Sequence, residues 1–231
     1  MYPIELIGIS KTFPSAGKGS EELLILDKID FKAQEGMSTA IIGKSGSGKS
    51  TLLQIAGGLD SPSEGQVICS GTDFSSLNEK EKAEHRNKHI GFIFQANLLL
   101  EDFTALENVL MPSLISGAKE SECKRRAADL LEMTGLKDRL NHYPSQLSGG
   151  EKQRIAICRA LMNNPDLILA DEPTGSLDEE NASQIEELLL SLVKSQHKSL
   201  LLVTHNNDFA NKCDYVYLLS NRKLTLMKGA K

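Results

Sequence analysis

A glycine-rich segment near the start of the chain has the residue types and spacing that hold the phosphates of a nucleotide. The segment consists of Gly43, Lys44, Ser45, Gly46, Ser47, Gly48, Lys49, Ser50 and Thr51. Its glycines let main-chain N–H groups wrap around phosphate oxygens, Lys49 can neutralise their charge, and the Ser50 hydroxyl can hold a Mg²⁺ ion. Apolar spacing predicts a strand at Ser38–Ile42 and a helix at Lys49–Ala56, whose N-terminus adds a positive pole. The segment therefore predicts a site for ATP and Mg²⁺.

Two adjacent carboxylates follow a short apolar stretch much later in the chain. Leu167–Ala170 is expected to be a strand, and Asp171 and Glu172 come directly after it. Ligands of α/β proteins bind at the carboxyl ends of such strands. Asp171 can hold Mg²⁺ through its water shell, and Glu172 can accept a proton from an attacking water. Alone, such a pair is more often a solvated strand end, but beside a phosphate-binding loop we favour catalysis.

A third segment predicts the start of a helix. Ser148 and Glu151 have the spacing of a capping box, in which each side chain binds the other residue's main-chain N–H. Gly149 and Gly150 keep side chains away from the helix N-terminus, so an anion could approach its main chain closely. Taken alone, this pattern is a capped helix with nothing bound.

The elements that must position these residues alternate between strand and helix, which favours a parallel sheet with right-handed crossovers. We expect an α/β fold that starts with a small β layer, contains a helical insertion from Ala96 to Met162 and ends in a hairpin. The remaining expected elements are strands at Ile4–Ile9, Leu23–Phe31, Ile90–Phe94, Ser199–Thr204, Tyr215–Leu219 and Lys223–Met227, helices at Glu120–Met133 and Glu179–Val193, and a turn-rich stretch at Pro14–Ser20.

Composition limits the class of protein. A chain of 231 residues can form one well-buried core, and a formal charge of −5 gives no overall field that attracts nucleic acid. No apolar run reaches the length of a membrane span, and the first residues lack the pattern of a secretory signal, so we expect a cytosolic chain without direct membrane insertion. The four cysteines are isolated and predict neither a zinc site nor a redox pair.

Taken together and in chain order, the motifs resemble those of the ABC ATPases. The set is the phosphate-binding loop, Gln95 after a strand, Leu147–Glu151, Ile168–Glu172, Ser176–Asp178 and His205 after a strand. The resemblance implies a P-loop NTPase with a RecA-like parallel-sheet core, an N-terminal antiparallel β sub-domain and an inserted α-helical sub-domain. It implies one domain over 1–231, with the β layer and nucleotide-binding core at 1–95 and 164–231 and the helical sub-domain at 96–163.

The same resemblance implies roles for further residues. Phe13 resembles the aromatic residue that stacks on adenine, Gln95 the residue that senses Mg²⁺ and the attacking water, and His205 the one that contacts the γ-phosphate. In that family two copies associate head to tail, so Ser148, Gly149 and Gly150 of one copy would face ATP held by the other, with Asp178 as the cross-dimer acid. For each residue the alternative is a structural role in a loop, strand end or helix cap.

Four segments indicate which branch of the ABC ATPases this chain resembles. Ile55–Asp60 and Leu98–Val109 are similar to the ATPase of lipoprotein-releasing exporters, and His85–Asn87 with Asn163–Pro165 are similar to a branch that includes macrolide exporters and cell-division ABC ATPases. This implies integral-membrane permease partners and a peripheral place on the cytoplasmic face of the bacterial inner membrane.

Other functions within and outside this branch stay open. Lys44 and Glu101 stand where the relatives more often carry other residues, which weakens the assignment of the transported substrate. An exporter of drugs or peptides, a mechanotransmission unit, or a regulatory or scaffolding module of a cell-division complex are the alternatives. Intact Lys49, Glu172 and His205 favour turnover over a purely regulatory role. DNA-repair ABC ATPases are disfavoured because the insertion lacks long heptad arrays.

Overall fold

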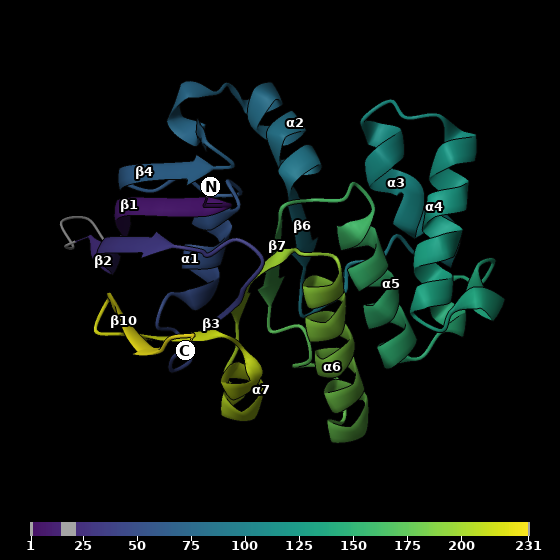
Figure 1. Ribbon diagram of the computed structural model, residues 1–231. Helices are drawn as coiled ribbons and strands as arrows, with labels where there is room; N and C mark the ends of the chain where they lie inside the picture. Colours follow the sequence, from purple (N-terminus) through teal and green to yellow (C-terminus); the bar gives the residue numbers. More distant parts are fainter. Residues whose placement is uncertain (1, 15–21, 231) are drawn as a thin grey trace.

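Two sheets and the helices around them form the molecule (Figure 1). The computed structural model describes residues 2–14 and 22–230, so most of the turn expected at Pro14–Ser20 lies outside the described residues. The four-stranded antiparallel sheet has the order β2-β1-β4-β5, and the six-stranded sheet has the order β10-β9-β3-β8-β7-β6. In the larger sheet β10 pairs with β9 antiparallel, and all other pairs are parallel. This arrangement confirms the expected fold class.

The strands fall into two groups by sheet. The four-stranded sheet contains β1 (Ile4–Phe13), β2 (Leu23–Lys32), β4 (Glu64–Cys69) and β5 (Thr72–Asp73). The six-stranded sheet contains β3 (Ser38–Ile42), β6 (Ile90–Ile93), β7 (Leu167–Asp171), β8 (Ser199–Val203), β9 (Tyr215–Ser220) and β10 (Lys223–Lys228).

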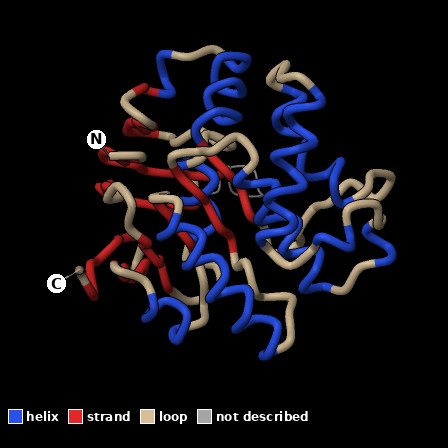
Figure 2. Tube along the Cα trace, turned by 45° about the vertical axis from the view of Figure 1, so that its right-hand side comes forward, coloured by secondary structure: helices blue, strands red, loops and turns tan. Residues whose placement is uncertain are grey.

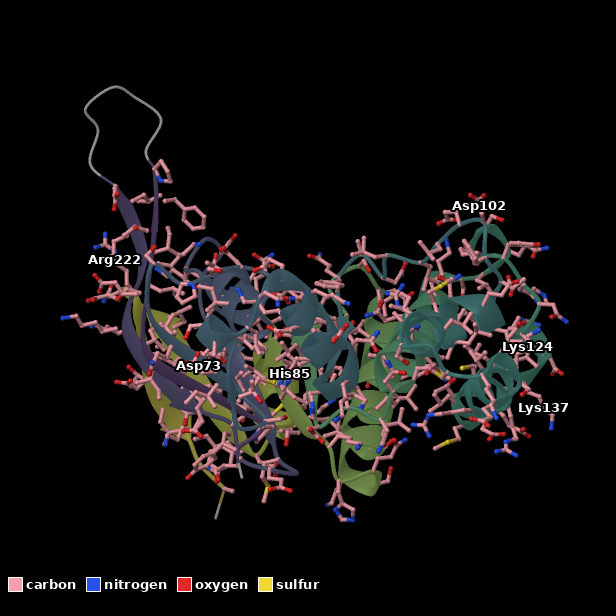
Figure 3. The ribbon with its side chains drawn as sticks, turned by 90° about the horizontal axis from the view of Figure 1, so that it is seen from above. Asp73, His85, Asp102, Lys124, Lys137 and Arg222 are labelled. Carbon is pink, nitrogen blue, oxygen red and sulfur yellow. The ribbon has the colours of Figure 1, made fainter. Side chains whose placement is uncertain are left out.

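The described helices lie on both faces of the larger sheet and beside it (Figure 2). They are α1 (Lys49–Ala56), α2 (Glu79–His89), α3 (Ala105–Ile115), α4 (Glu120–Met133), α5 (Gly149–Leu161), α6 (Glu179–Ser195) and α7 (Asn207–Lys212). Short 3₁₀ turns occur at Phe74–Ser76, Lys137–Arg139 and Pro144–Gln146. Helices α3, α4 and α5 pack together at one end of the molecule, where Asp102, Lys124 and Lys137 lie, while Arg222 lies at the other end (Figure 3).

The larger sheet separates two hydrophobic cores. Alternate residues of a strand point to opposite faces, so Leu167 and Leu201 pack with α1 and the smaller sheet. Ile168 and Leu200 pack on the other face with α3 to α7. Helix α1 is thereby held between the two sheets, which fixes the position of the phosphate-binding loop that precedes it.

The sequence predicted the core strands closely and missed four elements. The bounds of β3 and α1 match those expected, whereas β4, β5, α2 and α7 were not foreseen. Helix α2 has no buried residue, so it carries no apolar periodicity, and its Asn78–Glu81 capping box was the signal available. Helices α3, α4 and α5, which belong to the 96–163 segment, pack together in one core. The limits of the sub-domains stay a prediction. Among the described residues, no helix is long and apolar enough to cross a membrane.

Candidate functional site

The registers of the parallel strands bring the predicted site residues to one edge of the larger sheet. Ile41 of β3 and Asp171 of β7 both pair with Val203 of β8, and Ile93 of β6 pairs with Ala170. The segments that follow these strands therefore start side by side. They are the phosphate-binding loop, the acid pair, the Gln95 segment and the Thr204–His205 segment, all at the carboxyl edge, where α/β ligands bind.

The phosphate-binding loop has little room for side chains. Gly48 has φ of 98°, and a Cβ at this position would lie 2.7 Å from the Cγ2 atom of Ile25. Lys49 is buried, and its Nζ donates hydrogen bonds to the carbonyls of Gly43 at 2.9 Å and Lys44 at 3.2 Å. The Ser47 hydroxyl is buried and has no hydrogen-bond partner within the described part of the chain. Both features fit a loop that binds phosphate oxygens: within the described residues, the Lys49 ammonium binds loop carbonyls, and the Ser47 hydroxyl has no partner.

Ser50 and Asp171 form the expected oxygen pair. The Ser50 hydroxyl donates to Oδ1 of Asp171 at 3.0 Å, linking the first turn of α1 to the end of β7. Burial raises the pKa of the Asp171 carboxyl, the Ser50 hydrogen bond opposes this, and the neighbouring Glu172 charge raises the pKa further. A hydroxyl and a half-buried carboxylate are ligands that Mg²⁺ accepts, and a cation here would favour the charged carboxylate.

Glu172 is held by residues that follow β8. Its carboxylate accepts hydrogen bonds from the Thr204 hydroxyl at 3.2 Å and the His205 main-chain N–H at 3.3 Å, and Nδ1 of His205 lies 2.9 Å from its second oxygen. The Glu172 side chain is 16% exposed and that of His205 is 72% exposed. Glu172 has φ of 45°, an uncommon conformation for this residue. Such strain and orientation by neighbours are found at functional sites.

One cavity of about 480 Å³ brings most of the predicted residues together. Its lining consists of Phe13, Ile25, Ser45, Gly46, Gly48, Lys49, Ser50, Thr51, Gln95, Glu172 and His205. Gly43, Lys44, Ser47 and Asp171 do not line it, although they belong to the same loop or bind a lining residue. Its lining combines polar residues of the phosphate-binding loop with the aromatic ring of Phe13, which could stack on a base, so the cavity suits a nucleotide.

The Ser148–Gly150 segment lies at a different cavity of about 410 Å³. The Ser148 hydroxyl caps α5, and Glu151 accepts from the Ser148 main-chain N–H, which is the main cause of its lowered pKa. A Cβ on Gly150 would lie 2.9 Å from Oδ1 of Asn181, whose own amide donates to Asp178. The two cavities share no lining residue. Within one chain, therefore, Ser148–Gly150 and Asp178 do not complete the first cavity.

Several residues of these sites were missed by sequence reasoning. Ile25 lines the nucleotide-sized cavity, Thr204 orients Glu172, and Arg139 binds Glu151 at 2.9 Å. Thr204 stands next to His205 at a strand end, which was a usable signal. Nothing local marks Ile25 or Arg139, because their contacts come from tertiary packing.

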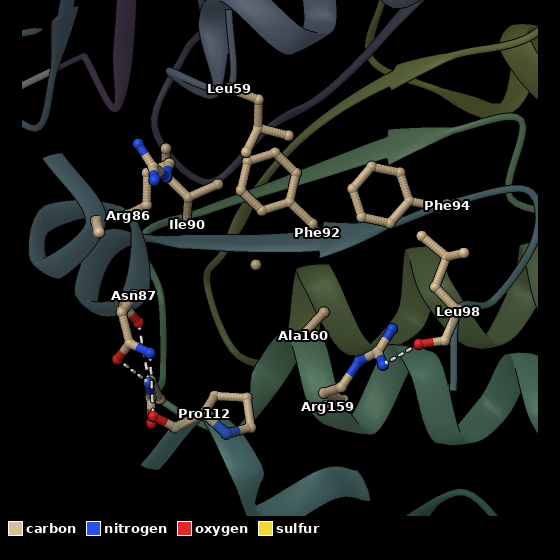
Figure 4. A pocket seen from close by; sticks show the side chains of 13 residues that line it. Leu59, Arg86, Asn87, Ile90, Phe92, Phe94, Leu98, Pro112, Arg159 and Ala160 are labelled. Carbon is tan, nitrogen blue, oxygen red and sulfur yellow. Dashed lines mark hydrogen bonds between the residues drawn. The ribbon is translucent and has the colours of Figure 1, made fainter. Parts of the chain in front are cut away.

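A groove of about 430 Å³ lies between α2, β6 and α5 (Figure 4). Exposed Leu59 and Leu98 and the parallel rings of Phe92 and Phe94 give it an apolar surface. Its polar side chains are two guanidinium groups and the amides of Asn87 and Asn163, which bind each other. Leu59 belongs to Ile55–Asp60, and Leu98 begins Leu98–Val109. The two segments similar to the ATPase of lipoprotein-releasing exporters thus meet at this groove.

A comparison with known families matches residues 26–175 to the model described as "ABC transporter". The chain belongs to the ABC transporter family. This ABC ATPase is 50% identical in sequence to "Lipoprotein-releasing system ATP-binding protein LolD" of Treponema denticola, over 92% of each chain. It is 48% identical to the protein of the same name in Alcanivorax borkumensis, over 87% of this chain and 89% of that one.

Solved structures of ATP-binding cassettes resemble this ABC ATPase over nearly its whole length. A dimeric, post-hydrolysis structure of the cassette MJ0796 bound to ADP and Pi has a TM-score of 0.87 and 37% identity, covering 97% of this chain and 98% of that one. The structure of cbiO1 from Clostridium perfringens has a TM-score of 0.84 and 27% identity, covering 97% of this chain and 87% of that one. These matches confirm the predicted P-loop NTPase fold.

Gly48→Ala tests the geometry of the phosphate-binding loop. The added methyl group meets Ile25 and strains the main chain, so we expect at least about a tenfold loss in ATP affinity, measured by calorimetry. Gly36→Ala is the matched control, because Gly36 also has a positive φ of 69° but no atom within 4 Å of the added Cβ. Equal ATP affinity in both variants and the wild type would contradict the assignment.

Proposed function

We propose that this chain is the ATP-hydrolysing subunit of an ABC complex that releases lipoproteins from the inner membrane toward the outer membrane. The identity of 50% over 92% of both chains with a relative named for lipoprotein release carries the assignment of substrate class. The Glu172 carboxylate, oriented at a cavity that the phosphate-binding loop lines, carries the assignment of hydrolysis.

Binding of ATP is attributed to the loop and the first strand. Main-chain N–H groups of 43–51 and the Lys49 ammonium hold the phosphates, and Phe13 stacks on the base. Phe13 is 38% exposed, with the Lys11 ammonium 5.0 Å from its ring centre, so part of the ring is free for a ligand. Ser50 and Asp171, with Gln95, would hold a Mg²⁺ ion, which supplies positive charge to the phosphates.

Hydrolysis is attributed to three residues at the carboxyl edge. Glu172 accepts a proton from the water that attacks the γ-phosphate in line, and Gln95 positions that water. The His205 side chain stays mostly exposed while its Nδ1 binds Glu172, so its second ring nitrogen can turn to the γ-phosphate. The protein thus contributes positioning and charge stabilisation rather than covalent chemistry.

The complete site is proposed to form between two copies of the chain. Ser148, Gly149 and Gly150 present a helix N-terminus that attracts anions, but Ser148 and Gly150 line a cavity separate from the nucleotide-sized one. A head-to-tail dimer would bring them to ATP held by the second copy, with Asp178 beside them. A solved cassette that is 37% identical in sequence is dimeric and bound to ADP and Pi, which supports a dimer of this chain.

The membrane partner is proposed to dock in the groove that Leu59 and Leu98 border. Exposed apolar side chains beside guanidinium groups suit a segment of another protein, and the groove lies next to the Gln95 segment. The chain would then lie on the cytoplasmic face of the bacterial inner membrane, held there by integral-membrane permease subunits.

Glu172→Gln tests the catalytic assignment. The amide keeps the size of the side chain and loses the proton acceptor, so we expect turnover to fall at least about 100-fold while ATP affinity stays within about twofold. Phosphate release and ATP binding by the purified complex measure the two effects. Glu84→Gln on exposed α2 is the control and should keep wild-type turnover. Wild-type phosphate release by Glu172→Gln would refute the role.

Depletion and rescue test the substrate and the docking groove together. Cells depleted of this chain should accumulate outer-membrane lipoproteins in their inner membrane, seen by membrane fractionation. Wild type and Met227→Glu, a change on exposed β10, should restore release, whereas Leu59→Glu should not, since it adds a charge to the apolar rim. Normal lipoprotein release in depleted cells would exclude this function and favour a drug or peptide exporter. Rescue by Leu59→Glu would exclude the groove.

A further inference from the structure

Side chains from elsewhere in the fold bind the main chain of the loop that contains Gln95. Residues 94–98, here called the Gln95 loop, follow β6 without regular secondary structure. The Gln153 amide donates a long hydrogen bond of 3.4 Å to the Phe94 carbonyl, and the Ser176 hydroxyl donates one of 3.1 Å to the Gln95 carbonyl. The two peptide groups that flank Gln95 are therefore both held from outside the loop.

Arg159 binds the next part of the same loop. One terminal nitrogen donates to the Leu98 carbonyl at 2.7 Å (Figure 4), and the other donates to the Asn97 carbonyl at 2.7 Å. Burial lowers the pKa of the guanidinium. A planar guanidinium can hold two carbonyls in fixed relative positions, so Arg159 restrains the loop where Leu98 has an uncommon φ of 50°.

The side chain of Gln153 is unfavourable for the stability of the folded state at its buried position. The side chain is 1% exposed, and its Oε1 atom is buried with no hydrogen-bond partner in the described chain. A buried, unpartnered acceptor destabilises the folded state, and an apolar side chain of similar size would avoid this. Stability alone does not account for an amide here, whereas the bond to Phe94 does.

Gln153 and Arg159 both project from α5, the helix that Ser148–Gly150 begins. Helix α5 lies directly against β6, because a Cβ on Gly91 would come within 2.3 Å of the Ala160 carbonyl. One rigid helix therefore carries the glycine-rich end that faces the second cavity and the two side chains that hold the Gln95 loop.

We propose that Gln153 and Arg159 are positioning residues that fix Gln95 relative to α5. Gln95 then reaches the attacking water only when α5, with its Ser148–Gly150 end, is in place. This inference rests on the proposed function, since it assigns the residues to ATP turnover. Neither residue touches the nucleotide-sized cavity, so both act through the loop.

Steady-state kinetics of the purified complex test the proposal with Gln153→Leu and Arg159→Met. We expect kcat to fall about tenfold or more, with KM for ATP within about twofold, because the loop moves while the phosphate-binding residues do not. The Tm of Gln153→Leu should equal or exceed that of the wild type, which separates positioning from a structural role. Arg159→Lys should retain more turnover than Arg159→Met, since an ammonium can still bind one carbonyl.

Arg126→Met is the matched control. Arg126 also donates to two main-chain carbonyls, those of Leu161 and Met162 at the end of α5, but does not bind the Gln95 loop. Its kcat should stay within about twofold of wild type. Gln153 does not line the groove, so Gln153→Leu also separates positioning from contact with a membrane partner. Wild-type kcat in Gln153→Leu, or an equal loss in Arg126→Met, would overturn the proposal.

Hydrogen exchange distinguishes this proposal from the proposed function. Amides of residues 95–104 should exchange about tenfold faster in Gln153→Leu and Arg159→Met than in the wild type and Arg126→Met, whatever the ATPase activity. A wild-type complex that does not hydrolyse ATP would refute the proposed function. Unchanged exchange in both variants would refute the positioning role.

Discussion

The parallel register of β3, β8, β7 and β6 is the constraint on which the rest of the structure depends. It aligns Ile41, Val203 and Asp171, so the segments that follow three strands start at the same edge. A shift of one residue would turn the side chains of a strand to the opposite face. Leu167 and Ile168 would then exchange cores, and the acid pair would leave the phosphate-binding loop. The packing of the two cores and the geometry of the site are thus fixed by the same pairing.

The chain on its own presents two separate cavities, which we propose to be the two halves of one site. One half holds the phosphate-binding loop and Glu172, and the other holds the N-terminus of α5. Helix α5 connects the halves physically, because it also binds the Gln95 loop beside the groove through Arg159. If ATP, the second copy and the membrane partner bind where we propose, each of them contacts α5 or the loop that α5 holds.

Sequence reasoning succeeded where local pattern and function coincide. The strand, loop and helix around Gly48 matched because glycine spacing and apolar periodicity mark each boundary. It failed for α2, whose charged residues have no buried face, and did not foresee that β9 would pair with β3. Contacts such as Gln153 with Phe94 join residues far apart in sequence, and no local pattern encodes them.

The composite nature of the site is the central claim, and mixing two inactive variants tests it most directly. Lys49→Ala disables the phosphate-binding loop of its own chain, and Ser148→Arg disables the segment offered to the second copy. In a head-to-tail dimer each homodimer has no intact site, whereas the mixed dimer has one. The account predicts that each variant alone lacks ATPase activity and that the mixture regains a substantial part of it. A mixture as inactive as its components would contradict it.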